Sequence, residues 1–385
     1  MGGTNLDART AENAVLGSVV MAAGGGGSVE LGLRLGQMAV ELGHASRVSL
    51  DCLSSTTEIA AVAALDEGTR EHPSYRLAYH RRALELLTSN AKADVGGLVP
   101  VGGGALNVMA SWGQAALLDI PLIDASFETP AHPCPWRAFV DLLAHDVPVI
   151  SLAVVGKPAG GEEQLETFLR GGPGAVSTLI ERLAAAGGSY ALCFGPLSSK
   201  WVRGRAQVGR MSRLIEVGGV LRRATADGGR MVAQAVSQAV GGQLVMPATV
   251  AKTSWTRTDG GALGVIRLLD EKERSVRLTH WHRYVALEGD DGRLATFPDL
   301  IVTLGARGTP LQADELGEGQ DVFIVIAPPQ FPSPLEGAAP EAVPDWLAVL
   351  KGEGSSTPAV AACAEDRGPL SSRDGSREVE RMRGS

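Results

Sequence analysis

The order of hydrophobic patterns along the 385 residues constrains the fold more than any other feature of this sequence. In the first half, short apolar stretches typical of buried strands alternate with segments whose apolar residues recur at helical spacing. The strand-like stretches include VGGLVPVGGGALN (95–107), IPLIDAS (120–126), VPVISLAVV (147–155) and YALCFGPLSS (190–199). This alternation predicts a three-layer α/β/α domain with glycine-rich loops, which we place at residues 1–195.

The pattern changes after residue 240, where short stretches of alternating polar and apolar residues are separated by glycine and aspartate turns. These stretches predict a small antiparallel β-barrel domain over residues 241–330. Between the two domains, residues 196–240 form a predicted helical connection that is interrupted near Gly228 and Gly229. Residues 331–385 are rich in proline, glycine, serine and charge, and we expect a largely disordered tail.

The charge and the cysteine content of the chain argue against several classes of protein. The formal net charge is -8 and no basic run is present, which argues against nucleic acid and anionic membranes as partners. The four cysteines lie far apart without a CxxC pair, and the first ten residues do not resemble a signal peptide. We therefore expect a cytoplasmic homo-oligomer with reduced thiols that takes a small-molecule substrate.

Four consecutive glycines, Gly24 to Gly27, precede a helix-like segment that Ser28 is suited to cap. The block fits neither the dinucleotide fingerprint nor the Walker motif, because the required final glycine and the lysine are missing. It is therefore either a nest of backbone amides that favours an oxyanion or a carboxylate, or a close-packed turn. A second glycine block also follows a strand and opens a helix, so both blocks are expected to face one pocket. The predicted substrate contacts from these blocks are Gly25, Gly26, Gly27, Ser28, Gly103, Gly104 and Asn107.

Three residues between positions 124 and 134 are candidates for catalysis. Asp124 ends a predicted strand, where it would act as a general base or orient water, or else stabilise a turn. His132 and Cys134 follow in a loop with three prolines, TPAHPCPW (129–136), and together with Asp124 they could supply a nucleophile and its base. Packing of Cys134 in the core is the alternative.

Other polar residues are candidates for binding. His280 and His282 in THWHRY (279–284) are expected on one face of a strand, where they form a hydrogen-bonding surface. No metal site and no cofactor are predicted; zinc, for which two histidines are too few ligands, is the less favoured alternative. Arg203 follows a turn and could clamp a substrate carboxylate, or simply be solvated at a helix start. Ser126, beside Asp124, completes the predicted substrate contacts.

Several motifs resemble the S-methyl thiohydantoin desulfurase family over roughly residues 10 to 330. They are GGGG after a helix, PVGGGALN, PLIDAS, PLSSKWVR, and PDLI followed by ELxxGQ. The resemblance implies a three-layer α/β domain followed by a small β-barrel domain. It also implies hydrolysis at the C–S carbon of an S-methylated thiohydantoin ring, which leaves hydantoin and methanethiol.

The chain departs from the family pattern at polar positions. Where the family has carboxylates, this chain has Ser28, Val101 or Gly102, Ser126 and Cys134. Arg203 replaces the family's lysine. The residues around His280, His282 and Arg283 replace an Asn-Glu-Asn segment of the family. The scaffold motifs are retained while these positions differ, which indicates a divergent member with a changed substrate or reaction.

We predict an enzyme, hydrolase-like or desulfurase-like, that hydrolyses or substitutes a ring carbon of a small hydantoin-like cyclic amide or imide. The glycine amides would hold the carbonyl oxygen as its charge grows, and Asp124 with His132 would manage the water or the leaving group. Two alternatives stay open: a biosynthetic cyclase or dehydratase that forms such a ring, and a non-catalytic ligand-binding subunit of a hydantoinase-like assembly.

Overall fold

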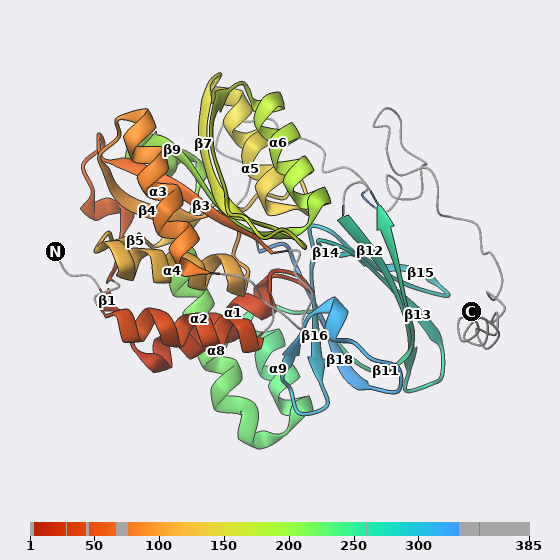
Figure 1. The fold of residues 1–385 in the computed structure, drawn as a ribbon. Coiled ribbons are helices and arrows are strands. Elements are labelled where there is room, and N and C mark those ends of the chain that lie inside the picture. The colour runs from red at the N-terminus through yellow and green to blue at the C-terminus, as the bar shows by residue number, and fades with distance from the viewer. Residues whose placement is uncertain are drawn as a thin grey trace, which may run out of the picture.

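The protein contains two eight-stranded sheets that are joined through helices (Figure 1). The computed structural model describes residues 4–27, 29–43, 46–66, 76–258 and 261–330, together with Trp346. Ser28 and all of the predicted tail except Trp346 lie outside the described residues. The boundaries of the predicted domains stay predictions.

The first sheet has a parallel centre and antiparallel flanks. Its strands β2, β5, β4 and β3 run parallel to one another, whereas β1, β9, β7 and β8 pair antiparallel with their neighbours. In spatial order the strands are β1 (Thr4–Asn5), β2 (Ser46–Val48), β5 (Leu122–Ile123), β4 (Val95–Pro100), β3 (Glu58–Asp66), β9 (Gly188–Ser198), β7 (Ile150–Pro158) and β8 (Leu165–Gly171). The patterns above did not pick out β3, because a continuous apolar run such as EIAAVAALD also fits a buried helix.

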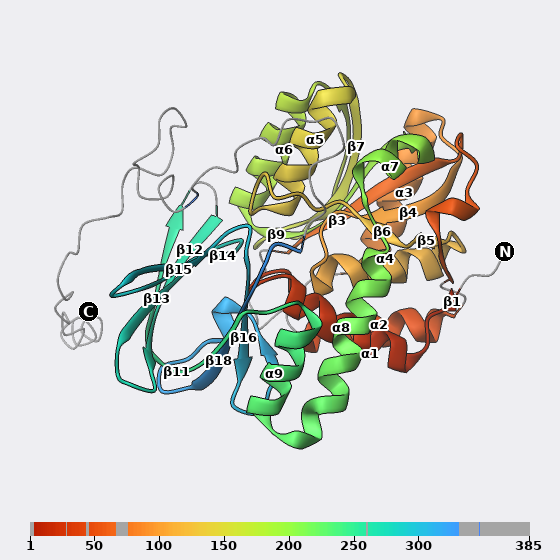
Figure 2. The same ribbon diagram turned by 180° about the vertical axis from the view of Figure 1, so that it is seen from behind.

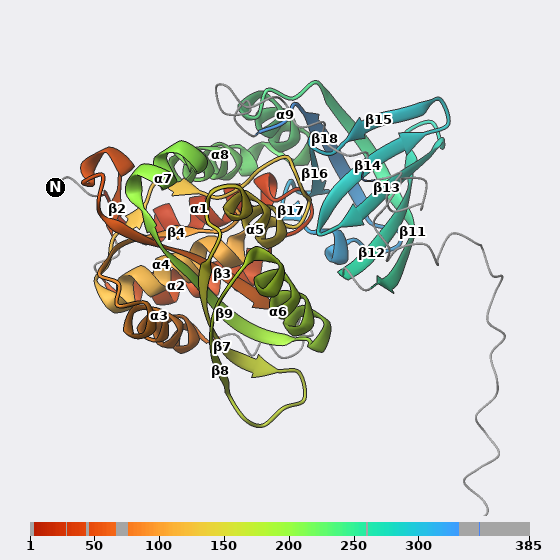
Figure 3. The ribbon, with the colours of Figure 1, turned by 90° about the horizontal axis from the view of Figure 1, so that it is seen from above.

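Helices cover both faces of this sheet, as successive strand residues point to opposite sides (Figure 3). Ala60 and Val62 of β3 pack with one group of helices, and Ile59 and Ala61 with the other. The first group is α1 (Ala8–Met21), α2 (Val29–Leu42), α3 (Leu77–Ala91), α4 (Ala105–Leu118) and α8 (Arg210–Ala224). The second is α5 (Pro135–Asp146), α6 (Pro173–Ala186) and α7 (Ser199–Arg205). The predicted α/β organisation of the N-terminal half is confirmed.

The connection between the sheets consists mainly of helices and is interrupted at Gly228. Helix α8 is followed by a short 3-10 turn (Thr225–Asp227) and then by α9 (Gly229–Ala239). Gly228 has φ of 90°, a conformation that glycine adopts without steric cost, and the chain changes direction there. Helix α8 packs along α1, while α9 packs on strands β16 and β18 of the second sheet (Figure 2).

The second sheet is antiparallel throughout. In spatial order its strands are β15 (Gly292–Thr296), β14 (Arg283–Gly289), β13 (Ser275–Trp281), β12 (Gly261–Asp270), β11 (Leu244–Thr258), β18 (Asp321–Ala327), β16 (Leu300–Gly305) and β17 (Pro310–Leu311). The predicted barrel is wrong: in the described ranges the terminal strands β15 and β17 do not pair, so the sheet is open. Alternating patterns predict strand pairing, but barrel closure depends on strand tilt and stagger, which those patterns do not specify.

Two smaller features complete the fold. Strand β6 (Ala125–Ser126) pairs with β10 (Gln207–Val208), and 3-10 turns span Leu50–Cys52 and Ala313–Glu315. No helix within the described ranges combines the length and the apolar character that crossing a bilayer requires.

His80 shows that helical spacing can mislead at a single position. The spacing in α3 predicts that His80 faces water with Arg81 and Arg82, but its side chain is buried (1% exposed) beside Gln114. Burial lowers the pKa of His80 from 6.5 to about 4, so the ring is neutral in the folded protein at neutral pH.

Acid should therefore destabilise the protein through His80. Below pH 6.5 the unfolded ring takes up a proton that the folded ring accepts only near pH 4, so stability present at neutral pH is lost as pH falls. Between about pH 7 and pH 5, His80 should account for roughly 2 kcal/mol of lost unfolding free energy. Urea denaturation of His80→Gln should show correspondingly weaker pH dependence, whereas exposed His145→Gln should match wild type. Equal pH dependence in His80→Gln and wild type would contradict the argument.

Candidate functional site

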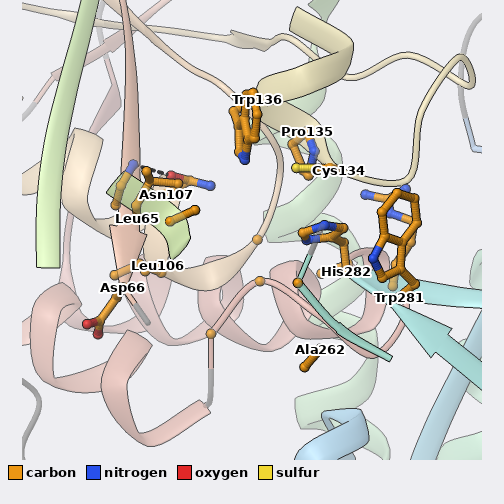
Figure 4. A pocket seen from close by; sticks show the side chains of 18 of the residues that line it. Leu65, Asp66, Leu106, Asn107, Cys134, Pro135, Trp136, Ala262, Trp281 and His282 are labelled. Atoms are coloured by element: carbon orange, nitrogen blue, oxygen red, sulfur yellow. Dashed lines mark hydrogen bonds between the residues drawn. The ribbon is translucent and has the colours of Figure 1, made fainter. Parts of the chain in front are cut away.

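A cavity of about 1600 Å³ lies between the first sheet and the second. Its walls come from the carboxyl end of β3, the two glycine blocks and the loop that precedes α5. Helix α6, the β11–β12 hairpin and the β13–β14 connection complete them. In Figure 4, Cys134, Pro135, Trp281 and His282 lie on one side, opposite Leu65, Asp66, Leu106 and Asn107, with Trp136 between them. Seven predicted site residues line this one cavity: Gly26, Gly27, Gly104, Asn107, His132, Cys134 and His282.

The first glycine block is a close-packed turn. A Cβ on Gly25 would lie 2.0 Å from the carbonyl oxygen of His282, and a Cβ on Gly26 would lie 2.6 Å from the Cα of Gly104. Gly24 and Gly26 also have φ of 82° and 89°. The turn ties the end of α1 to strand β14 of the second sheet, because the Tyr284 amide donates to the Ala23 carbonyl oxygen at 2.7 Å.

The turn leaves backbone amides at the cavity. In the described parts of the chain, the Gly26 and Gly27 amides donate to no backbone acceptor, and both residues line the cavity. The Gly26 carbonyl oxygen accepts from the Leu106 amide at 2.9 Å, which ties the first block to the second. Close packing thus explains the glycines, and the amide cradle for a substrate oxygen stays a prediction.

The two residues from the proline loop sit at the start of α5. Cys134 is the N-cap residue of this helix and is only 2% exposed, and its amide donates to His132 Nδ1 at 2.9 Å. Burial, with the nearby charges of His282 and Arg137, lowers the pKa of His132 to about 3. His132 is therefore neutral, carries its proton on Nε2, and orients the loop that presents Cys134.

His282 forms the one-residue connection between β13 and β14. Its φ of 61° places it in the left-handed region, and its ring lines the cavity (Figure 4). The ring packs against Trp281 at a tilt of 59°, with centroids 4.9 Å apart. The expectation that His280 and His282 share a strand face is wrong, because the strand ends at Trp281 and the chain turns at His282.

His280 instead belongs to the packing of the second sheet. Its ring lies edge-on to Trp255 and Tyr284, at centroid distances of 5.5 and 5.7 Å. Burial is the main cause that lowers the pKa of His280 to about 3. His280 is therefore a neutral ring at neutral pH.

Asn107 contributes a donor to the cavity. Its Oδ1 accepts from the Ala64 amide at 2.6 Å, which fixes the amide orientation and leaves Nδ2 directed toward the space beside Trp136 (Figure 4). Trp346 packs edge-on against His132, with ring centroids 4.4 Å apart.

Asp124 and Arg203 do not line the cavity. Asp124 pairs with Arg47 (Oδ2 to Nη1, 3.1 Å) and accepts from the Ser212 amide at 2.9 Å, which holds the start of α8. Arg203 pairs with Asp51 and donates to the Leu50 carbonyl oxygen at 2.9 Å. Their predicted roles in catalysis and in substrate binding stay predictions, but both groups have structural partners.

A buried ion triad forms part of the cavity wall, where Arg283 lines the cavity, and the sequence patterns did not predict it. Glu128 Oε2 is 2.7 Å from Arg210 Nε, and Glu128 Oε1 is 3.5 Å from Arg283 Nη2. The predicted contacts Ser126 and Gly103 support Glu128 rather than the cavity: Ser126 Oγ donates to Oε2 at 3.3 Å, and the Gly103 amide also bonds to the carboxylate.

Among the residues that the structure describes, no group of three His, Cys, Asp or Glu side chains could hold a metal ion. The expectation that the protein uses no cofactor stays a prediction.

The fold and the cavity define a protein with an α/β region and an open antiparallel sheet that share one binding cavity. A family model described as S-Me-THD-like, C-terminal domain, matches residues 177–334. This match supports the membership in the S-Me-THD-like family that the motifs predicted.

The fold also occurs in a solved structure. An X-ray crystal structure of a protein from Chromobacterium violaceum is similar with a TM-score of 0.63 and 17% sequence identity, covering 91% of this chain and 98% of that one. This likeness concerns the fold alone. No curated protein matches the chain.

Proposed function

We propose that the protein is an enzyme that replaces a substituent on a ring carbon of a hydantoin-like cyclic amide, with Cys134 as nucleophile. The observation that carries this proposal is the meeting of Cys134, His282, Asn107 and the Gly26–Gly27 amides around one cavity. The family name supports a hydantoin-related substrate. Of the three candidate catalytic residues, Cys134 and His132 line the cavity and Asp124 does not, so the proposed chemistry does not use Asp124.

The residues could perform the substitution in two steps, with an S-methyl thiohydantoin as the substrate. Cys134 gives its proton to His282, and its sulfur attacks the ring carbon. The C–SCH3 bond then breaks with its electron pair leaving on methanethiolate, which takes that proton from His282. Water then adds to the same carbon and gives one proton to His282, while the Cys134 sulfur leaves as a thiolate. The second proton of the water moves to the ring nitrogen, so the products are hydantoin and methanethiol.

Donors around the cavity would stabilise the charge that develops on the ring. The Asn107 Nδ2 group and the Gly26 and Gly27 amides are fixed before substrate binds, so they need no reorganisation during the reaction. His132 cannot accept the thiol proton at Nδ1, because that atom already accepts from the Cys134 amide. His282 is therefore the proposed proton carrier.

A mass-spectrometric screen tests the proposal. Purified protein would be incubated with hydantoins, S-methyl thiohydantoins, cyclic imides and their ring-opened acids. We expect exchange of SCH3 for OH on the ring, with Cys134→Ser at least about 100-fold slower than wild type. Cys52→Ser is the matched control, since Cys52 is exposed and does not line the cavity.

Each other outcome changes the conclusion. Equal turnover by Cys134→Ser and wild type would remove Cys134 from the chemistry. Ring closure of an acid would support the cyclase alternative. A ligand that raises the melting temperature without any mass change would support the ligand-binding subunit.

A further inference from the structure

Trp346 is the one residue beyond position 330 that the structure describes, and its ring lies between the two halves of the protein. The ring is edge-on to His132, with centroids 4.4 Å apart, and tilted by 37° to Trp281, with centroids 5.6 Å apart. His132 belongs to the loop before α5, whereas Trp281 ends β13 of the second sheet. Trp346 therefore contacts residues of both halves at once.

The second sheet supplies an apolar cluster on which the Trp346 ring packs. Trp281, Val285 and Phe297 form its buried part, and Leu263 and Trp346 pack against them. The Trp346 Nε1 atom is buried and has no hydrogen-bond acceptor in the described part of the chain. Because an unpaired buried N–H costs free energy, the contacts of the ring, rather than a hydrogen bond, hold the indole in place.

Both ring partners of Trp346 line the cavity, although Trp346 itself does not. His132 Nδ1 accepts from the Cys134 amide at 2.9 Å, and the Trp281 ring packs against the His282 ring on the same side of the cavity (Figure 4). His132 and Trp281 also contact each other, with centroids 5.3 Å apart. Each of the three rings of His132, Trp281 and Trp346 therefore touches the other two, and loss of the Trp346 ring would leave a space behind this wall.

We propose that Trp346 is a positioning residue, whose ring holds the His132 and Trp281 rings in place and thereby fixes the loop that presents Cys134. Only the role of Cys134 as nucleophile rests on the proposed function; the packing of Trp346 does not. Without the indole, His132 would lose a contact on one side. The loop would then depart more often from the arrangement in which His132 accepts from the Cys134 amide.

Alkylation of the cysteines in the full-length protein tests the proposal without any substrate. Labelling by iodoacetamide under native conditions would be followed at each cysteine by mass spectrometry of the peptides. Cys134 is only 2% exposed, so its labelling rate reports how often its loop opens. We expect Trp346→Ala to raise this rate at least about tenfold. Trp346→Phe keeps an aromatic ring and removes the unpaired N–H, so its rate should stay within about threefold of wild type.

Two other cysteines serve as internal controls. Cys52 is exposed and should be labelled at the same rate in all three proteins. Cys193 is fully buried in β9 of the first sheet, so its labelling reports opening of the whole protein and should not change. Equal Cys134 rates in Trp346→Ala and wild type would overturn the proposal. A parallel rise at Cys134 and Cys193 would also overturn it, because it would show a general loss of stability. None of these rates depends on turnover of a hydantoin, so this proposal and the proposed function can fail separately.

Discussion

Replacement of Glu128 by glutamine is expected to lower the free energy of unfolding by about 3–5 kcal/mol. The carboxylate is the counter-charge of two buried guanidinium groups, and glutamine has a similar shape without the charge. Two positive groups would then face each other with little screening. Since Arg210 lies on α8 and Arg283 on β14, the loss should also loosen the attachment of the second sheet to the first.

Urea denaturation followed by circular dichroism would measure this effect. Glu271→Gln is the matched control, because its ion pair with Arg230 is exposed and should contribute no more than about 1 kcal/mol. A loss in Glu128→Gln as small as that in the control would show that the triad does not need its carboxylate.

Replacement of Gly26 by alanine is expected to destabilise the protein by a similar amount, about 3–5 kcal/mol. The added Cβ would meet the Cα of Gly104 at 2.6 Å, and backbone atoms cannot move aside as a flexible side chain can. The φ of 89° adds a penalty of about 1–2 kcal/mol for any residue with a Cβ. The same change would push apart the two glycine blocks that line the cavity.

Gly319→Ala separates these two costs. Gly319 has φ of 80°, but no described heavy atom lies within 4 Å of a Cβ built there, so only the backbone penalty of about 1–2 kcal/mol remains. Thermal unfolding of both variants would give the difference. Equal losses at Gly26 and Gly319 would mean that the blocks are not in tight contact.

Most of the secondary structure could be predicted from the sequence, because the spacing of apolar residues in a segment indicates which of its faces is buried. The interrupted helical connection at Gly228 and the antiparallel strands after residue 240 follow from such patterns. Strand β3 was missed because its continuous apolar run fits both element types, and His80 was misplaced because one position can depart from the helix average.

Much of the candidate site was also readable, since residues at strand ends and in loops before helices are often displayed at a sheet edge. This reasoning brought Gly26, Gly104, Asn107 and Cys134 to one cavity. The same reasoning also placed Asp124 at the site, because Asp124 follows a strand of the same sheet. In the structure its side chain turns away to Arg47 and Ser212.

By itself, the sequence determined the kind and order of most elements and the resemblance to the family, because these depend on periodicity, turn residues and local motifs. Only the tertiary structure decided that the second sheet stays open and that His282 turns toward Cys134. It also decided that Glu128 meets Arg283, a residue 155 positions away. Such contacts between distant residues depend on how the sheets and helices pack against each other. No local sequence pattern specifies that packing, which decides which buried charged groups form ion pairs.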